Sequence, residues 1–240
     1  MGRKNWSKRS RRRENGQEIL EFTLVTWLIL IPMFLGMIRV GLNLVRTNQV
    51  VFITSDLATM YVQGQDFSTY SLQNLATRLA TGLDLEVGSS FTGNNAANTG
   101  NGGSVIVTMT KMMYVGTDSQ PTCLSVGASG SGKCKNASSF VYLQRVSFGN
   151  AAITGAPASL AGTPNSSIVI DSGGNVTNYL TDTNAQLPAT ADAAMDNLWS
   201  PGTANGLQDG QIVYLTEMYF DSTSFAFGTT GQGVYAKYFF

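Results

Sequence analysis

The sequence predicts an α+β protein in which a long N-terminal helix packs on an antiparallel β-sheet. An apolar run without a charged side chain extends from Phe22 to Ile38. An amphipathic pattern with a 3.6-residue period continues that run through residues 41–63. Strand-like segments rich in β-branched and aromatic residues, beginning with Val105–Val115, occupy the second half of the chain.

The apolar run is long enough to suggest a membrane span. At a rise of about 1.5 Å per residue, Phe22–Ile38 covers about 26 Å. Ile19, Leu20 and a snorkelling Arg39 extend this toward the hydrocarbon thickness of about 30 Å. A buried core helix is the alternative, but core helices of this length rarely lack a polar stripe. We therefore expect a transmembrane helix over residues 17–40.

Basic residues predict the orientation of this span. Seven of them precede it: Arg3, Lys4, Lys8, Arg9, Arg11, Arg12 and Arg13. Only Arg39 and Arg46 follow closely, so the N-terminus should stay in the cytoplasm and the C-terminal part should be exported. A nucleic-acid-binding arm is disfavoured because the apolar run starts so soon after the cluster. No Ala-x-Ala-like cleavage site follows the run, so the span should remain attached.

Glu21 is an unusual residue at the cytoplasmic edge of the apolar run. A charge at mid-bilayer costs about 2.5–3.5 kcal/mol on insertion scales, and less near the edge. Ionisable residues in or beside a span are functional candidates. The alternative is a glutamate that simply reaches the lipid headgroups.

The residues around Glu21 resemble a known signal. Gly16 followed by "QEILEF" and a long apolar helix is similar to the class III signal of type IV pilins. The stretch "RRRENGQEILEF" resembles the start of TadE-like proteins, which are minor pseudopilins of the tight-adherence (Flp) pilus system. This resemblance implies a pilin-like fold and cleavage by a prepilin peptidase between Gly16 and Gln17, which removes residues 1–16 as a basic cytoplasmic leader. Glu21 and Phe22 match the family's Glu-Phe pair.

The resemblance also implies a mechanism. Cleavage frees an α-amine on Gln17, whose reference pKa is near 7.7–8.0. As fifth residue of the mature chain, Glu21 would neutralise the amine of a neighbouring subunit, and low dielectric strengthens such a pair. The implied partners are the peptidase, the lipid bilayer and other pilins or pseudopilins. The alternative is an unprocessed single-pass membrane protein whose exported domain binds a partner.

The likeness is weaker elsewhere. "LQRVSFGN", "YLTEMYFD" and "VYAKYFF" resemble strand segments of TadE-like domains. TadE-like chains usually carry a proline about five residues after the Phe, where this chain has Trp27. Its proline is Pro32, so the position of a kink differs from the family pattern.

Composition agrees with export. Past Gly16 there are eight Lys and Arg against fourteen Asp and Glu, a net charge of −6. This acidic balance argues against nucleic acid as a partner.

Cys123 and Cys134 flank "LSVGASGSGK", which predicts a local disulfide in an oxidising compartment, the periplasm or cell surface of a bacterium. A metal or redox pair is weaker, because the chain has no histidine and no Cys-x-x-Cys.

The helix should continue past the span into an amphipathic helical region over residues 41–86. Its apolar side is formed by Leu42, Val45, Ile53, Leu57 and Met60. We expect one helix from about Gln17 to Gln63, stopped near Gly64, with the second half of its apolar side on the exported domain. A shorter helix is expected over Tyr70–Thr81.

The shorter helix should have Ser68 as its cap. The rest, residues 87–240, should form a β-rich domain. It should begin with an exposed Gly/Asn-rich loop up to Ser104. Two antiparallel pairs are expected: Val105–Val115 with Ser139–Phe148, and Gln211–Phe220 with Gly233–Phe240. The insert between them, at about residues 151–209, should hold a short strand at Ser167–Ile170 and a short helix at Thr190–Leu198.

Two charged residues, Arg145 and Glu217, fall in the middle of predicted strands. They could form a cross-strand ion pair, but we favour the prediction that each lies on a solvated face.

No catalytic constellation is visible, since the chain lacks histidine and "GASGSG" has no partner base. We therefore expect no enzyme activity, cofactor or metal.

Overall fold

The computed structural model describes residues 17–87, 97–100, 102–117, 119–126, 134–203, 206–221 and 233–240. The predicted leader, residues 1–16, lies outside them. The chain divides into two compact units, Met1–Thr47 and Asn48–Phe240, which are described separately. The predicted α+β class is confirmed by a long N-terminal helix followed by a five-stranded sheet.

The first unit contains the start of the long helix. Residues 17–25 are α-helical, Thr26–Leu30 form a π-helical turn, and α2 (Ile31–Val62) follows. The backbone N–H of Ile31 bonds to the carbonyl of Thr26, five residues back. Pro32 has no N–H and its ring crowds the carbonyl four residues earlier, so a wider turn just before it relieves this clash. The irregular turn thus precedes the proline.

The end of the helix agrees with the sequence prediction. The helical stretch from Gln17 to Val62 is 46 residues long. Gly64 follows with φ +86, a left-handed conformation that glycine adopts without a steric penalty. The stop near Gly64 is confirmed.

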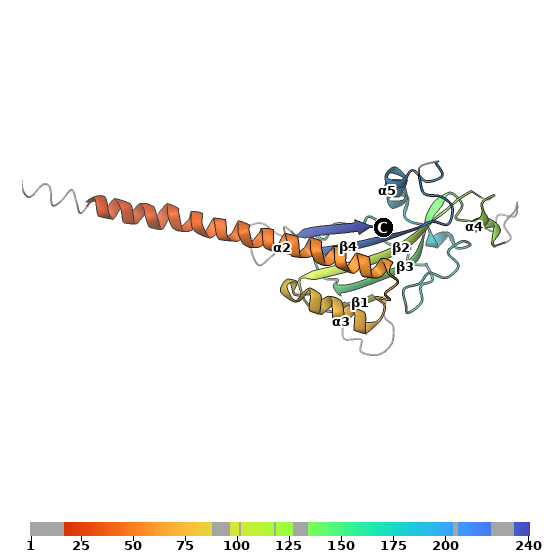
Figure 1. Ribbon diagram of the computed structural model, residues 1–240, viewed down its shortest axis with the longest axis horizontal. Helices are drawn as coiled ribbons and strands as arrows, with labels where there is room; N and C mark the ends of the chain where they lie inside the picture. Colours follow the sequence, from red (N-terminus) through yellow and green to blue (C-terminus); the bar gives the residue numbers. More distant parts are fainter. Residues whose placement is uncertain are drawn as a thin grey trace, which may run out of the picture. The chain divides into compact units, whose positions relative to one another are not determined.

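The second unit is built on one mixed sheet with strand order β1-β3-β2-β4-β5 (Figure 1). Its strands are β1 (Ala97–Gly100), β2 (Val105–Val115), β3 (Ser139–Asn150), β4 (Ile212–Phe220) and β5 (Val234–Phe239). Both predicted antiparallel pairs are present, and β2 also pairs with β4. However, β1 pairs with β3 in parallel, so the prediction of a wholly antiparallel sheet is wrong at this edge.

Strand β1 falls within the segment predicted to be an exposed loop. Two buried amides explain why this Gly/Asn-rich piece joins the sheet. The Asn98 side chain donates to Gln73 Oε1 at 2.6 Å, and Gln73 Nε2 donates to the carbonyl of Phe67 at 2.9 Å. Both amide side chains are buried, so each needs a partner, and together they connect β1 to helix α3 (Tyr70–Leu79).

Helix α3 begins near the predicted residue but with a different cap. Thr69 occupies the N-cap position, and its side chain makes no capping bond. Ser68 is buried instead, and its backbone N–H bonds to Asp66 Oδ1 at 3.0 Å. The prediction that Ser68 caps α3 is therefore wrong, because an Asp66 turn takes up the backbone just before the helix.

One face of the sheet is covered by α3 and the end of α2. The apolar cluster between them includes Val50, Leu57, Tyr61, Phe67, Ala76, Val107, Met109, Phe148 and Met218. The Tyr61 hydroxyl also donates to Gln144 Oε1 on β3 at 3.1 Å. Leu42 and Val45, expected on the same apolar side, are exposed. Within the second unit, the buried residues of α2 begin at Val50.

The insert covers the other face of the sheet. It contains η3 (Thr183–Ala185) and α5 (Ala189–Trp199), which confirms the predicted helix at Thr190–Leu198. Figure 1 shows α5 at the end of the sheet away from α3. The predicted strand at Ser167–Ile170 is not formed, since only Ile170 pairs, in an isolated bridge to Val176.

Apolar contacts join the insert to this face. The shared cluster includes Met112, Phe140, Tyr142, Val213, Leu215, Ala161, Leu187, Ala191 and Met195. The insert also covers the outer edge of β3, where Arg145 N–H bonds to the Gly174 carbonyl at 2.8 Å and Leu187 N–H to the Phe140 carbonyl at 3.0 Å. Because the insert bonds to these backbone groups, β3 presents few free N–H and C=O groups along its outer edge.

Candidate functional site

The surface of the N-terminal helix is the first candidate site. Between Gln17 and Gln49, all of which the structure describes, no side chain is buried. Large apolar groups are open to the surroundings, with Phe22 73% and Trp27 72% exposed. Within the described part of the chain, one helix is long and apolar enough to cross a membrane. An exposed apolar surface of this extent indicates lipid or other protein around it.

Polar groups at the start of this helix are few and mostly satisfied locally. The hydroxyl of Thr23 donates to the Ile19 carbonyl and that of Thr26 to the Phe22 carbonyl, both at 2.8 Å. Glu21 differs because its exposed carboxylate has no such bond to the backbone and receives one weak contact, from Gln17 Nε2 at 3.2 Å.

The predicted cleavage pair is described only in part. Gly16 lies outside the described residues, whereas Gln17 is in the first described turn of the helix and is exposed. Gln17 and Glu21 are four residues apart, about 6 Å along the helix axis. A group on a neighbouring helix would reach Glu21 without displacing any partner except the Gln17 amide. A carboxylate in apolar surroundings is stabilised by such a cation and penalised without one.

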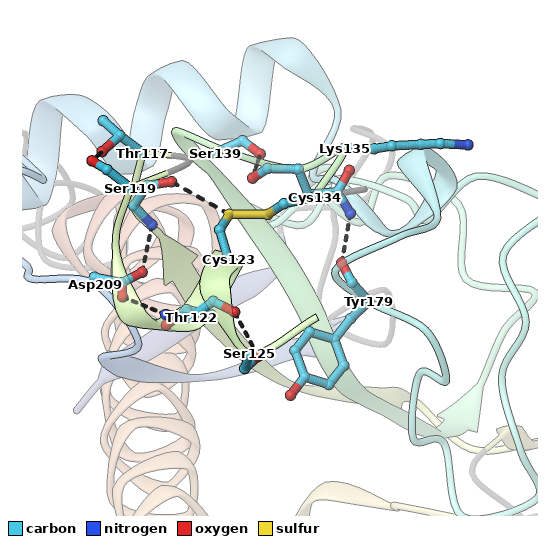
Figure 2. Close-up of a disulfide and its surroundings, with 12 residues drawn as sticks. Thr117, Ser119, Thr122, Cys123, Ser125, Cys134, Lys135, Ser139, Tyr179 and Asp209 are labelled. Atoms are coloured by element: carbon cyan, nitrogen blue, oxygen red, sulfur yellow. Dashed lines mark hydrogen bonds between the residues drawn. A yellow bond between two sulfur atoms is a disulfide. The ribbon is translucent and has the colours of Figure 1, made fainter. Parts of the chain in front are cut away.

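The cysteine pair forms a second feature, at the tip of the β2–β3 hairpin (Figure 2). The sulfur atoms of Cys123 and Cys134 lie at bonding distance, and their Cα atoms are 5.3 Å apart, as in ordinary disulfides. Cys123 lies in the single-turn helix α4 (Pro121–Leu124). Asp209 holds that turn, because its carboxylate accepts the N–H of Gly116 at 2.7 Å and of Thr122 at 2.9 Å.

A third feature lies under the insert, where the two mid-strand charges are found. Glu217 is 3% exposed, so the prediction that it lies on a solvated face is wrong. It accepts the Leu160 N–H at 2.8 Å and the hydroxyls of Ser159 and Tyr235. Arg145 is half-buried and donates from Nη1 to the Gly162 carbonyl at 2.9 Å. Arg145 lies on β3 and Glu217 on β4. Strand β2 lies between these strands, so the two residues are not direct cross-strand neighbours.

Burial changes the ionisation of the groups around Glu217. Burial, a hydrogen bond to Glu217 and its charge raise the pKa of Tyr235. Burial raises the pKa of Tyr142 to about 12, against the opposing effect of Arg145. Burial lowers the pKa of Arg145, while Tyr142 and Glu217 act in the opposite direction. The phenols therefore stay neutral and act as hydrogen-bond donors at neutral pH.

Sequence reasoning missed this cluster. The available signal was the placement of Arg145 and Glu217 among apolar and aromatic residues in the middle of predicted strands, which suggests burial with partners. Its partners Ser159 to Gly162 lie in a segment without periodicity and could not be matched to them. As for metals, no group of three or more His, Cys, Asp or Glu side chains that could hold an ion is found in the ranges that the structure describes.

Comparison with known proteins identified no relative of this chain. No protein-family model, no curated protein sequence and no solved structure matches it. The likeness to TadE-like proteins is therefore carried by the residues quoted above.

Proposed function

We propose that this protein is a minor pseudopilin of the TadE-like kind, a structural component in the biogenesis of an adhesive pilus. A prepilin peptidase would remove residues 1–16, and the helix would then dock with other pilins or pseudopilins. The observation that carries this proposal is the helix surface from Gln17 to Gln49, which has no buried side chain and yet is mostly apolar.

Glu21 supplies the chemistry of docking. After cleavage, the α-amine of Gln17 is mostly protonated at neutral pH, since its reference pKa is near 7.7–8.0. Glu21 is exposed on the same helix and has no charged partner within its own turn. Pairing the carboxylate with the amine of a neighbouring subunit would offset the penalty of placing either charge in an apolar environment.

The exported domain supports the proposed topology. The basic leader keeps the N-terminus in the cytoplasm, and residues 17–40 cross the bacterial inner membrane. Cys123 and Cys134, at bonding distance, fit a domain that folds in an oxidising, extracytoplasmic compartment. We assign no catalytic activity to the domain.

The alternative function is that of an unprocessed single-pass membrane protein with an extracytoplasmic partner-binding domain. It would use the same apolar helix as an anchor. In that case Gly16 stays uncut and Glu21 has no amine to neutralise.

Replacing Glu21 tests the proposed mechanism. In Glu21→Ala, peptidase processing should survive, while co-purification with other pilin subunits from the membrane should fall at least about tenfold, about 1.4 kcal/mol. Thr23→Ala is the matched control, because Thr23 is a nearby exposed polar residue that is satisfied within the helix. Equal recovery of partners by Glu21→Ala and the control would refute the pairing.

A further inference from the structure

Residues 151–164 are the first part of the insert. They form a strap across the sheet face that the insert covers. They contain no helix or strand, and only Ala161 among them is buried. The strap begins where Ala151 N–H bonds to the Gly100 carbonyl at 3.0 Å. With so little apolar area buried, the hydrophobic effect contributes little to holding it.

Hydrogen bonds from the sheet hold four consecutive residues of the strap. Glu217 accepts from Ser159 Oγ and from the Leu160 N–H. The Tyr142 hydroxyl donates to the Ala161 carbonyl, and Arg145 Nη1 donates to the Gly162 carbonyl. These sheet residues come from β3 and β4, so the strap is bound by side chains as an extended peptide ligand would be.

Tyr235 connects strand β5 to the carboxylate of Glu217. Its hydroxyl donates to Glu217 Oε1, the same oxygen that accepts the Leu160 N–H. Tyr235 lies on β5, diagonal to Glu217 across the β4–β5 pair. A carboxylate that is 3% exposed depends on its donors, so removing one of them leaves a buried charge less well compensated.

We propose that residues 151–164 are a strap that Glu217 closes over the sheet, and that Tyr235 makes this closure depend on β5 being in place. When the Tyr235 bond is lost, water replaces the strap as the partner of Glu217, and the strap opens. Opening exposes Glu217 and Arg145 on the sheet face. A partner that displaces β5 would therefore also release the strap. This inference does not depend on the proposed pilus role.

Amide hydrogen exchange of the full-length protein in detergent tests the strap. Tyr235→Phe removes one hydroxyl. Tyr238→Phe is the matched control, three residues along β5 and on the opposite face of the sheet. In Tyr235→Phe, the amides of Leu160 and Gly162 should exchange at least about tenfold faster, while the sheet amides of Met109 and Val146 keep their wild-type rates.

Two results would overturn the proposal. One is unchanged exchange at Leu160 and Gly162 in Tyr235→Phe. The other is equal acceleration in the strap and the sheet, which would mean general destabilisation.

A second variant covers the case in which Tyr235→Phe does not fold. Ser159→Ala removes a donor to Glu217 from the strap itself and leaves β5 intact. It should speed exchange at Leu160 about as much while Met109 and Val146 keep their wild-type rates, and unchanged exchange at Leu160 would contradict the proposal. Where both variants fold, the effect of Ser159→Ala should shrink in the double variant, because both substitutions act through one carboxylate. If the effects of the two substitutions on the exchange rate multiply independently, the proposed role of Glu217 in closing the strap is contradicted.

Discussion

The two halves of the N-terminal helix have the same secondary structure and opposite surroundings. From Gln17 to Gln49 no side chain is buried, although most are apolar. From Val50 to Val62 the helix buries residues at helical spacing, among them Leu57 and Tyr61, and exposes the rest. Apolar content alone therefore does not identify what covers a helix. A stripe on one side indicates a domain, whereas apolar residues all round indicate lipid or neighbouring helices.

The largest expected contrast comes from the same substitution in each half. Leu57→Ala should lower the free energy of unfolding of the second unit, Asn48–Phe240, by about 2–5 kcal/mol, because Leu57 is 0% exposed in the apolar cluster. Leu28→Ala should leave that free energy within about 0.5 kcal/mol, because Leu28 is 70% exposed. Denaturant unfolding of both variants in detergent, followed by near-ultraviolet circular dichroism, measures the difference. Similar losses in both would contradict the division of the helix.

The two halves of the N-terminal helix should also respond differently to alkaline pH. Burial, with Tyr214 and Asp66, raises the pKa of Tyr61, and burial raises that of Tyr142 to about 12. Because an unfolded phenol ionises near pH 10, the stability from these neutral phenols is complete below about pH 10 and is lost as pH rises above it.

Tyr61→Phe provides the test of this effect. It should make the free energy of unfolding fall less steeply above about pH 10 than in the wild type. The stretch from Gln17 to Gln49 contains no tyrosine and has no buried side chain, so its helicity should not follow this titration. Identical pH profiles for the variant and the wild type would exclude a contribution from Tyr61.

The smallest effect on stability is expected at Phe52. This residue lies in the half that packs on the domain, but it is 69% exposed. Phe52→Ala should therefore change the free energy of unfolding by less than about 0.5 kcal/mol, in contrast with Leu57→Ala five residues away. Thermal unfolding of the two variants gives the comparison. A loss at Phe52 as large as that at Leu57 would mean that both sides of this half are buried.

Periodic patterns account for what the sequence predicted well. The long helix, both antiparallel pairs and the helix at Thr190–Leu198 follow from local patterns of apolar residues, and the stop at Gly64 follows from the glycine itself. Strand β1 was missed because four residues, Ala97–Gly100, give no pattern and are held by the amides of Asn98 and Gln73. Such a contact between residues far apart in the chain leaves no trace in local composition.

The candidate sites divide in the same way. Glu21 and the pair Cys123 and Cys134 are visible because each stands out from its neighbours in the sequence. The partners of Glu217 were not visible, since its donors Ser159 and Tyr235 lie 58 and 18 residues away. Polar contacts between residues so far apart in the sequence depend on the tertiary fold. They leave no periodic pattern in the local sequence.

The intact mass of the protein extracted from membranes of its native host tests the central claim most directly. If the apolar half of the helix is a pilin-type assembly segment, the leader is cut and the protein begins at Gln17. We predict a mass lacking residues 1–16, with Gln17 as the first residue of the N-terminal peptide. A mature protein that retains the arginine-rich leader would contradict the account, and would leave a membrane-anchored domain of the unprocessed kind.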